Sequence, residues 1–169
     1  MNPVFVVAEI GINHNGSVEI ARQLIEAAKW AGADAVKFQK RTVDVVYTVE
    51  ELTHPRESPF GITNGDLKRG LEFGTDEYEQ IDDWCFFNNI HWFASPWDVG
   101  SVGFLQKFDV PWYKVASACI TDLSLLHAIN GTQKPVIIST GMSTIEQIGK
   151  AVWCFPDRRD VSLLACTST

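Results

Sequence analysis

The chain has 169 residues, of which 46% are hydrophobic and 21% are charged, and its formal net charge at pH 7 is -7. This balance is typical of a folded domain with a sizeable core and argues against a disordered chain. The negative charge argues against nucleic acid or an anionic membrane as the main partner, although a locally positive cleft can still bind a small anion. No apolar run approaches about 18 residues, and no basic stretch followed by an apolar one opens the chain, so we expect a soluble cytoplasmic protein.

The first third of the sequence predicts a strand, a helix and a second strand. Residues 4–8 form a continuous apolar run, as in a strand buried on both faces. Ser17 can cap a helix that ends at Gly32, and residues 35–38 form the next strand-like run. One apolar stripe follows the predicted helix, made of Ile20, Ala21, Leu24, Ile25, Ala28 and Ala31.

Residues 41–74 interrupt this alternation. The segment is polar, contains prolines and several glycines, and shows no sustained periodicity, so we expect a long loop with at most short helical turns. A loop of this length inside a compact domain is usually functional. Regularity returns at residues 75–89, where Thr75 or Asp76 is the expected cap of a helix whose first turn is acidic.

The rest of the chain repeats the alternation of strands and helices. Strand-like runs stand at residues 91–95, 113–117, 135–140 and 161–166, and helical patterns at 99–108, 122–130 and 143–155, the last opening with a capping box of Ser143 and Glu146. Six strands with intervening helices predict right-handed βαβ crossovers in a parallel sheet. A doubly wound sheet and a (β/α)8 barrel both fit. The sequence ends on a strand without a following helix, so we favour an incomplete TIM barrel of about six β/α units over residues 1–169.

Cysteine spacing gives little support for a metal or disulfide site. Cys85, Cys119, Cys154 and Cys166 are far apart, and no CxxC pair occurs. Each follows or interrupts an apolar segment, so we interpret them as buried, reduced thiols.

Polar side chains recur where the predicted strands end, which in a parallel α/β fold is the ligand-binding edge. The series comprises Glu9, Lys37, Gln39, Ser95, Asp98, Lys114, Ser117, Ser139 and Thr140, and it continues into the final residues "CTST". A lysine inside an apolar strand is costly to bury alone, so Lys37 and Lys114 favour a bound anion such as a phosphate or carboxylate. Glu9 is a candidate acid or base. A purely structural interpretation stays open: Glu9 could pair with Lys37, the serines could cap loops, and Asn13, Asn15 and Gly16 could only form a turn.

Six motifs in order give the sequence a resemblance to the sialic acid synthase family: "AEIGINHNG", "ADAVKFQ", "FASPWD", "YKVAS", "STGMST" and "LLACTS". The resemblance implies a (β/α)8 barrel that condenses phosphoenolpyruvate with an N-acetyl amino sugar, such as N-acetylmannosamine, to a nonulosonic acid and phosphate. By similarity, the phosphate and carboxylate of phosphoenolpyruvate would be held by Lys37, Ser95, Lys114, Ser117 and Ser139. Gln39 would contact the amino sugar and Glu9 would lie beside the reacting centre. Glu9, Lys37 and Lys114 are then the catalytic candidates, and Asn13 and Ser168 are further substrate-binding candidates.

The resemblance also implies features that this sequence does not contain. Family members use a divalent metal, Mn²⁺ or Mg²⁺, which polarises the sugar aldehyde. Its two histidine ligands fall beyond residue 169, so no residue here is a metal candidate. A small C-terminal domain resembling antifreeze proteins, which reaches into the partner's site of a homodimer, is also missing. We therefore expect the 169-residue chain alone to be inactive or nearly so.

Two other hypotheses fit the residues. Lys114 or Lys37 could form a Schiff base, as in aldolases of the TIM-barrel class. Alternatively, the chain could be a catalytically dead remnant that only binds a ligand or a complementary chain, because open sheet edges favour association.

Overall fold

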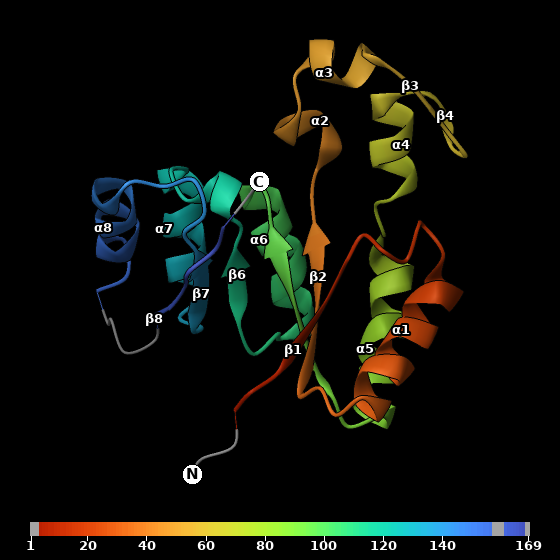
Figure 1. Cartoon of the computed structure of the whole chain (residues 1–169), viewed down its shortest axis with the longest axis horizontal. Helices are drawn as coiled ribbons and strands as arrows, with labels where there is room; N and C mark the ends of the chain where they lie inside the picture. The colour runs from red at the N-terminus through yellow and green to blue at the C-terminus, as the bar shows by residue number, and fades with distance from the viewer. Residues whose placement is uncertain (1–3, 157–160, 168–169) are drawn as a thin grey trace. The chain divides into compact units, whose positions relative to one another are not determined.

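The computed structural model describes residues 4–156 and 161–167 (Figure 1). The chain divides into two compact units, residues 1–92 and 93–169, and the boundary falls within strand β5 (His91–Pro96). No helix of the described residues is both long and apolar enough to cross a membrane. Each unit is described in turn.

The first unit begins with the predicted strand, helix and strand. Strand β1 (Val7–Gly11) pairs in parallel with β2 (Ala35–Lys40), and α1 (Val18–Trp30) connects them. The strand starts three residues later than predicted, since Val4 to Val6 are exposed. The Ser17 hydroxyl accepts the Ile20 N–H at 3.3 Å, which confirms the predicted cap.

The α1 stripe is confirmed at its centre, where Ala21, Ile25 and Ala28 are buried. Its two ends differ from the prediction, because Ile20 and Ala31 are exposed. The helix packs beside α5 (Thr75–Phe87), whose Ile81 and Cys85 are buried (Figure 1). The cap of α5 is Gly74 instead of Thr75 or Asp76, because the Glu77 carboxylate reaches back to accept the Gly74 N–H at 2.8 Å.

The segment Arg41–Gly74, called the excursion below, is more ordered than the sequence predicted. It contains the short helices α2 (Val43–Val46) and α3 (Val49–Thr53), the antiparallel hairpin of β3 (Pro55–Ser58) and β4 (Gly61–Thr63), and α4 (Asn64–Gly70). The short helices α2 and α3 agree with the predicted helical turns, but the prediction of an otherwise irregular loop was wrong, because it missed the hairpin and α4. Two capping boxes carried the missed signal, Thr48 with Glu51 and Thr63 with Asp66. Elements of three to seven residues are too short to produce a detectable periodicity.

The second unit contains four parallel strands in the order β5, β6 (Tyr113–Val115), β7 (Val136–Ser139) and β8 (Val161–Leu164). The helices α6 (Val99–Leu105), α7 (Leu123–Gly131) and α8 (Ile145–Trp153) follow the first three strands, as the sequence predicted. The 3-10 turn η1 (Gln106–Phe108) extends α6, and the 3-10 turn η2 (Ser117–Cys119) follows β6.

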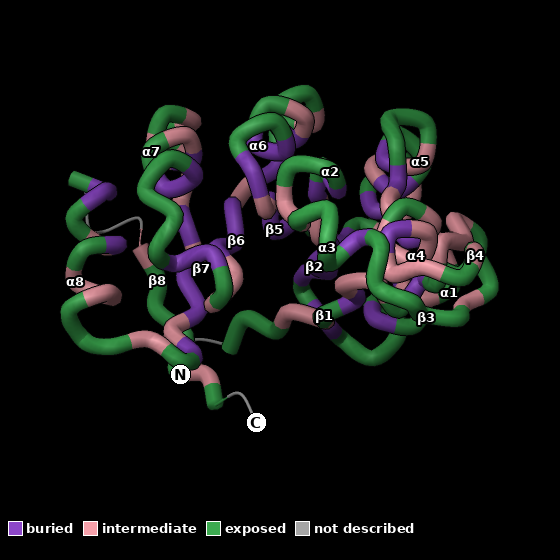
Figure 2. The backbone as a smooth tube through the Cα atoms, turned by 90° about the horizontal axis from the view of Figure 1, so that it is seen from above, coloured by how far each residue is buried: buried purple, intermediate pink, exposed green. Residues whose placement is uncertain are grey.

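Helix starts in this unit are set by side chains that accept backbone N–H groups. Asp98 and Asp122 cap α6 and α7. The box that opens α8 lies one residue later than predicted, since Thr144 pairs with Gln147 and not Ser143 with Glu146. Figure 2 shows β7 largely buried, and its Val136 and Ile138 are 1% exposed or less. The side chains at the end of β7 therefore follow a well-packed strand.

Candidate functional site

The first strand-end cluster consists of Glu9, Asn13, Lys37 and Gln39, all in the first unit. Glu9 lies opposite Lys37 in the register of β1 and β2, and Lys37 Nζ is 2.7 Å from Glu9 Oε2. The lysine side chain is 10% exposed, whereas that of the glutamate is 58% exposed. The alternative that these two residues pair is thus confirmed as a contact. The pairing balances the charge of the buried Lys37 ammonium. The exposed Glu9 carboxylate can still accept a proton or a hydrogen bond from a ligand.

Gln39 and Asn13 take different positions around this pair. Gln39 is half-buried near the end of β2, on the strand face of Lys37 by the period of two, and its carbonyl accepts the Tyr78 hydroxyl at 2.9 Å. Asn13 is exposed in the turn after β1, where its N–H donates to the Ile10 carbonyl at 2.9 Å. Both of these hydrogen bonds use backbone atoms, so neither occupies the side-chain amide of Gln39 or Asn13.

A buried ion pair that sequence reasoning missed follows directly on β2. Arg41 Nε donates to Glu72 Oε1 at 2.5 Å, the Arg41 N–H donates to Glu72 Oε2 at 3.1 Å, and Arg41 Nη1 donates to the Tyr47 hydroxyl at 2.9 Å. The two charged side chains are 3% and 11% exposed. Lys40 Nζ adds a bond to the Phe73 carbonyl at 2.5 Å. These contacts fasten the end of β2 to the end of the excursion.

His14 lies buried in the same unit, with 3% of its surface exposed. Burial and the nearby Arg41 charge lower the His14 pKa from 6.5 to about 4. The folded chain therefore keeps a neutral imidazole at pH values where the same histidine is protonated in the unfolded chain.

This lowered pKa predicts how stability depends on pH. Between pH 6.5 and 4 the unfolded chain binds a proton at His14 that the folded chain does not, so the free energy of unfolding falls as pH falls. The contribution is complete above pH 6.5, and about 3 kcal/mol of it is lost by pH 4. Urea unfolding at several pH values should show this slope, and His14→Asn should flatten it. An equal slope in both proteins would contradict the expectation.

The second strand-end cluster consists of Ser95, Lys114, Ser117 and Ser139, all in the second unit. Lys114 is 5% exposed, and its Nζ donates to Ser139 Oγ at 2.5 Å and to the Val115 carbonyl at 2.9 Å. Ser117 Oγ accepts the Gly141 N–H at 3.0 Å, which holds the loop after β7 against η2. Ser95 is 1% exposed at the end of β5. A buried ammonium among hydroxyls suits an anionic ligand.

Asp98 has a structural role despite its place in the strand-end series. Its Oδ1 accepts the Ser101 N–H at 2.9 Å and its Oδ2 accepts the Ser101 hydroxyl at 2.6 Å. Both oxygens are therefore committed to the cap of α6. Ser168 lies outside the described residues, so its predicted role stays a prediction.

Cys166 belongs to the second cluster and opens the final stretch that the strand-end series reached, although its sequence context gave no signal for a reactive thiol. A hydrogen bond with Ser139, the N–H groups of Thr140 and Gly141 and the Lys114 charge lower the pKa of the Cys166 thiol. Burial instead raises the pKa of Cys85 to about 12 and that of Cys119 to about 11, and it also raises the Cys154 pKa. All four thiols are free, and the prediction of burial is wrong for Cys166 alone, which is partly exposed.

These differences predict selective alkylation. A limiting amount of iodoacetamide at pH 7.5 should modify Cys166 well before the other three thiols, because the thiolate is the nucleophile and only Cys166 combines access with a lowered pKa. Peptide mass spectrometry of the native chain measures the order, and the three buried thiols serve as internal controls. Faster modification of Cys85 or Cys119 would contradict the described packing.

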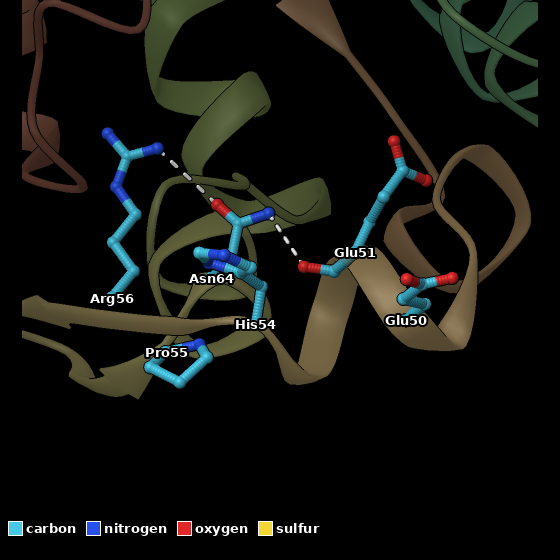
Figure 3. Close-up of a pocket in the computed structure, with 6 residues that line it drawn as sticks. All are labelled: Glu50, Glu51, His54, Pro55, Arg56 and Asn64. Carbon is cyan, nitrogen blue, oxygen red and sulfur yellow. Dashed lines mark hydrogen bonds between the residues drawn. The ribbon is translucent and has the colours of Figure 1, made fainter.

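A separate cavity of about 530 Å³ lies in the excursion and involves none of the predicted site residues. Figure 3 shows Asn64 between Arg56 and Glu51: Arg56 Nη1 donates to Asn64 Oδ1 at 3.4 Å, and Asn64 Nδ2 donates to the Glu51 carbonyl at 3.0 Å. The lining residues are Glu50, Glu51, His54, Pro55, Arg56 and Asn64. Most of them are exposed, so this cavity is a surface hollow and not an enclosed site.

Metal ligands do not gather in the part of the chain that the structure describes. Within residues 4–156 and 161–167, no group of three or more His, Cys, Asp or Glu side chains could hold a metal ion. These residues therefore do not fit a metal centre by themselves.

Comparison with known proteins places this arrangement in a family. A model of the NeuB family matches residues 24–169. The chain belongs to the NeuB family. It is 34% identical over 172 residues to N-acetylneuraminate-9-phosphate synthase of Mus musculus, covering 99% of this chain and 47% of that protein. It is 38% identical over 177 residues to pseudaminic acid synthase of Campylobacter jejuni, covering 98% of this chain and 50% of that protein.

A solved structure supports the same family and fold. The N-acetylneuraminic acid synthetase of Leptospira borgpetersenii, crystallised with citrate, matches with a TM-score of 0.83 and 32% identity, over 99% of this chain and 55% of that one. The prediction of an α/β fold with an incomplete barrel is thereby confirmed. This NeuB-family chain spans about half the length of the curated relatives that it matches.

Proposed function

We propose that this NeuB-family chain contributes the phosphoenolpyruvate-binding part of a nonulosonic acid synthase. The observation that carries the proposal is the buried Lys114 ammonium bonded to Ser139, with Ser117 and Ser95 at neighbouring strand ends. A fixed ammonium among hydroxyl groups complements the phosphate and carboxylate of phosphoenolpyruvate. The names of the relatives support the class of reaction, since they are synthases of sialic and pseudaminic acids.

In the proposed reaction the methylene carbon of phosphoenolpyruvate attacks the aldehyde carbon of the open-chain amino sugar. A carbon–carbon bond forms, the aldehyde oxygen takes a proton, and the former enol carbon becomes an oxocarbenium ion. Water adds to that carbon, and phosphate leaves by cleavage of its carbon–oxygen bond. Lys114, Lys37 and the serines would hold the anionic groups, and Glu9, exposed beside Lys37, would move a proton or orient water. Gln39 and Asn13 are proposed to bind the sugar side.

We propose the class of the acceptor, an N-acetyl amino sugar, and not one particular sugar. A divalent metal and a homodimer belong to the proposal for the longer relatives and not to the described residues of this chain. We also propose that the 169-residue chain alone has little or no synthase activity, because it spans only about half of the relatives' length.

Calorimetric titration of the chain with phosphoenolpyruvate tests the proposal. We expect saturable binding at or below millimolar ligand, and weaker binding of pyruvate, which lacks the phosphate. No heat of binding at millimolar phosphoenolpyruvate would refute the proposal. Borohydride reduction in the presence of pyruvate tests the Schiff-base alternative: a covalent adduct on Lys114 or Lys37 would favour the aldolase, and its absence would leave the synthase.

A further inference from the structure

The loop between β1 and α1, residues Ile12–Gly16, has an unusual backbone. Gly11, Asn15 and Gly16 have φ values of 57°, 51° and 74°, all in the left-handed region. Glycine adopts such conformations without strain and asparagine tolerates them, so the sequence suits this turn. The loop begins three residues after Glu9 and carries Asn13, so its position bears on both candidates.

His14 supplies the contacts that hold this loop from within. Its Nδ1 accepts the Gly16 N–H at 3.1 Å, and its carbonyl accepts the Ser17 N–H at 2.9 Å. The ring is stacked on Phe73, with centroids 4.0 Å apart and an angle of 24° between the planes. Since Nδ1 acts as an acceptor, the proton of the neutral ring is on Nε2. One side chain thus joins the loop backbone to the end of the excursion.

The hairpin of the excursion holds the loop from the other side. A Cβ atom at Gly16 would lie 2.3 Å from the Gly70 carbonyl oxygen and 2.9 Å from Phe60 Cζ. A Cβ atom at Gly70 would lie 2.2 Å from Phe60 Cγ. Phe60 stands in the turn between β3 and β4, so its ring packs against both glycines. The loop is therefore enclosed between Phe73 and the Phe60–Gly70 contact.

Charges around His14 favour the neutral ring that this arrangement needs. Arg41, at the end of β2, is the charged group that acts on the imidazole. Glu72, which precedes Phe73, is bonded to Arg41 and lies 3.9 Å from Lys40 Nζ, so its carboxylate is committed to those cations. Protonation of Nδ1 would remove the acceptor for the Gly16 N–H and place a second cation near Arg41.

We propose that His14 is a positioning residue that clamps the β1–α1 loop to the excursion and thereby sets the placement of Asn13 and of Glu9, the ion-pair partner of the phosphoenolpyruvate-binding candidate Lys37. The clamp itself rests on the contacts of the first unit. Its consequence for substrate rests on the proposed function. His14 touches no substrate in this scheme and acts through the loop.

Two substitutions separate the contacts that His14 makes. His14→Asn keeps an acceptor, because an asparagine side chain commonly accepts the N–H two residues on in an Asx turn. His14→Phe keeps a ring for stacking on Phe73 but has no acceptor for the Gly16 N–H. His54→Phe, at an exposed histidine at the end of α3 in the same unit, is the matched control.

Amide hydrogen exchange at Gly16, nitrogen chemical shifts of the His14 ring and phosphoenolpyruvate titration form the test. We expect the His14 shifts to report protonation at Nε2 alone at pH 7. His14→Phe should accelerate Gly16 exchange at least tenfold and weaken phosphoenolpyruvate binding about tenfold, whereas His14→Asn and His54→Phe should keep both within about threefold of the unsubstituted chain.

Each contrary result has one meaning. A His14 ring protonated at Nδ1, or Gly16 exchange that is equally fast in His14→Asn and His14→Phe, would overturn the clamp. Loosened Gly16 exchange with unchanged phosphoenolpyruvate affinity would overturn the positioning role. If the unsubstituted chain binds no phosphoenolpyruvate while Gly16 exchange follows the expected order, the proposed function fails and the clamp stands.

Discussion

Replacing Lys114 by methionine is expected to abolish detectable phosphoenolpyruvate binding while leaving the chain folded. Lys114 is 5% exposed, and its ammonium is bonded to Ser139 and the Val115 carbonyl. Removing the charged partner of a buried anion typically costs 2–5 kcal/mol of binding, which is roughly 30-fold or more in affinity. Methionine has a similar volume and avoids the desolvation cost of a buried charge, but it leaves the Val115 carbonyl and the Ser139 hydroxyl without this donor, so the free energy of unfolding should fall by no more than about 3 kcal/mol.

Lys134→Met is the matched control for this substitution. Lys134 Nζ lies 2.7 Å from Asp109 Oδ1, but the two side chains are 34% and 87% exposed. The pair precedes strands β6 and β7 along the chain, away from their carboxyl ends. Calorimetric titration and urea unfolding should therefore give nearly unchanged values for this variant. Wild-type affinity in Lys114→Met, or a large loss of stability without loss of affinity, would remove the basis for the anion site.

Alternation of apolar runs and helical patterns predicted the parallel strands and most helices correctly, because burial on both faces leaves a strong signal in sequence. Residues such as Val136 and Ile138 are apolar for this reason and were recognised as a strand. The excursion was missed because its order comes from local caps, glycines and a hairpin. Phe60 lies close to Gly16, 44 positions before it, and to Gly70, 10 positions after it, and no periodicity reports such contacts.

The candidate site was likewise predicted from the sequence only in part. Strand ends predicted Glu9, Lys37, Lys114 and Ser139, since the direction of a parallel sheet determines where such residues gather. The structure adds which of them meet: Glu9 with Lys37, and Lys114 with Ser139. Side chains that come from different segments, such as Glu72 beside Arg41, could not be paired from the sequence, because their contact depends on how the excursion folds back.

Breaking the Arg41–Glu72 pair is expected to give the largest loss of stability. Glu72→Leu removes the carboxylate that balances the buried Arg41, and Arg41→Met leaves the buried Glu72 with the more distant Lys40, 3.9 Å away, since the Arg41 and Glu72 side chains are 3% and 11% exposed. Each substitution should lower the free energy of unfolding by about 3–5 kcal/mol, a large fraction of the stability of a typical domain. The double variant should lose much less than the sum, because neither charge then remains buried. The exposed pair of Lys150 and Glu146, 2.8 Å apart, is the control and should contribute less than about 1 kcal/mol.

The same substitutions test whether this pair acts on the loop after β1. Burial is the larger cause of the lowered His14 pKa and the Arg41 charge adds to it, so Arg41→Met should raise this pKa part of the way toward the ordinary value. Nuclear magnetic resonance titration of the His14 ring measures this shift independently of any ligand. An unchanged His14 pKa in a folded Arg41→Met protein would contradict the electrostatic link. If the pKa rises, Arg41 does more than stabilise the excursion: its charge adds to burial in keeping neutral the imidazole that holds the loop after β1.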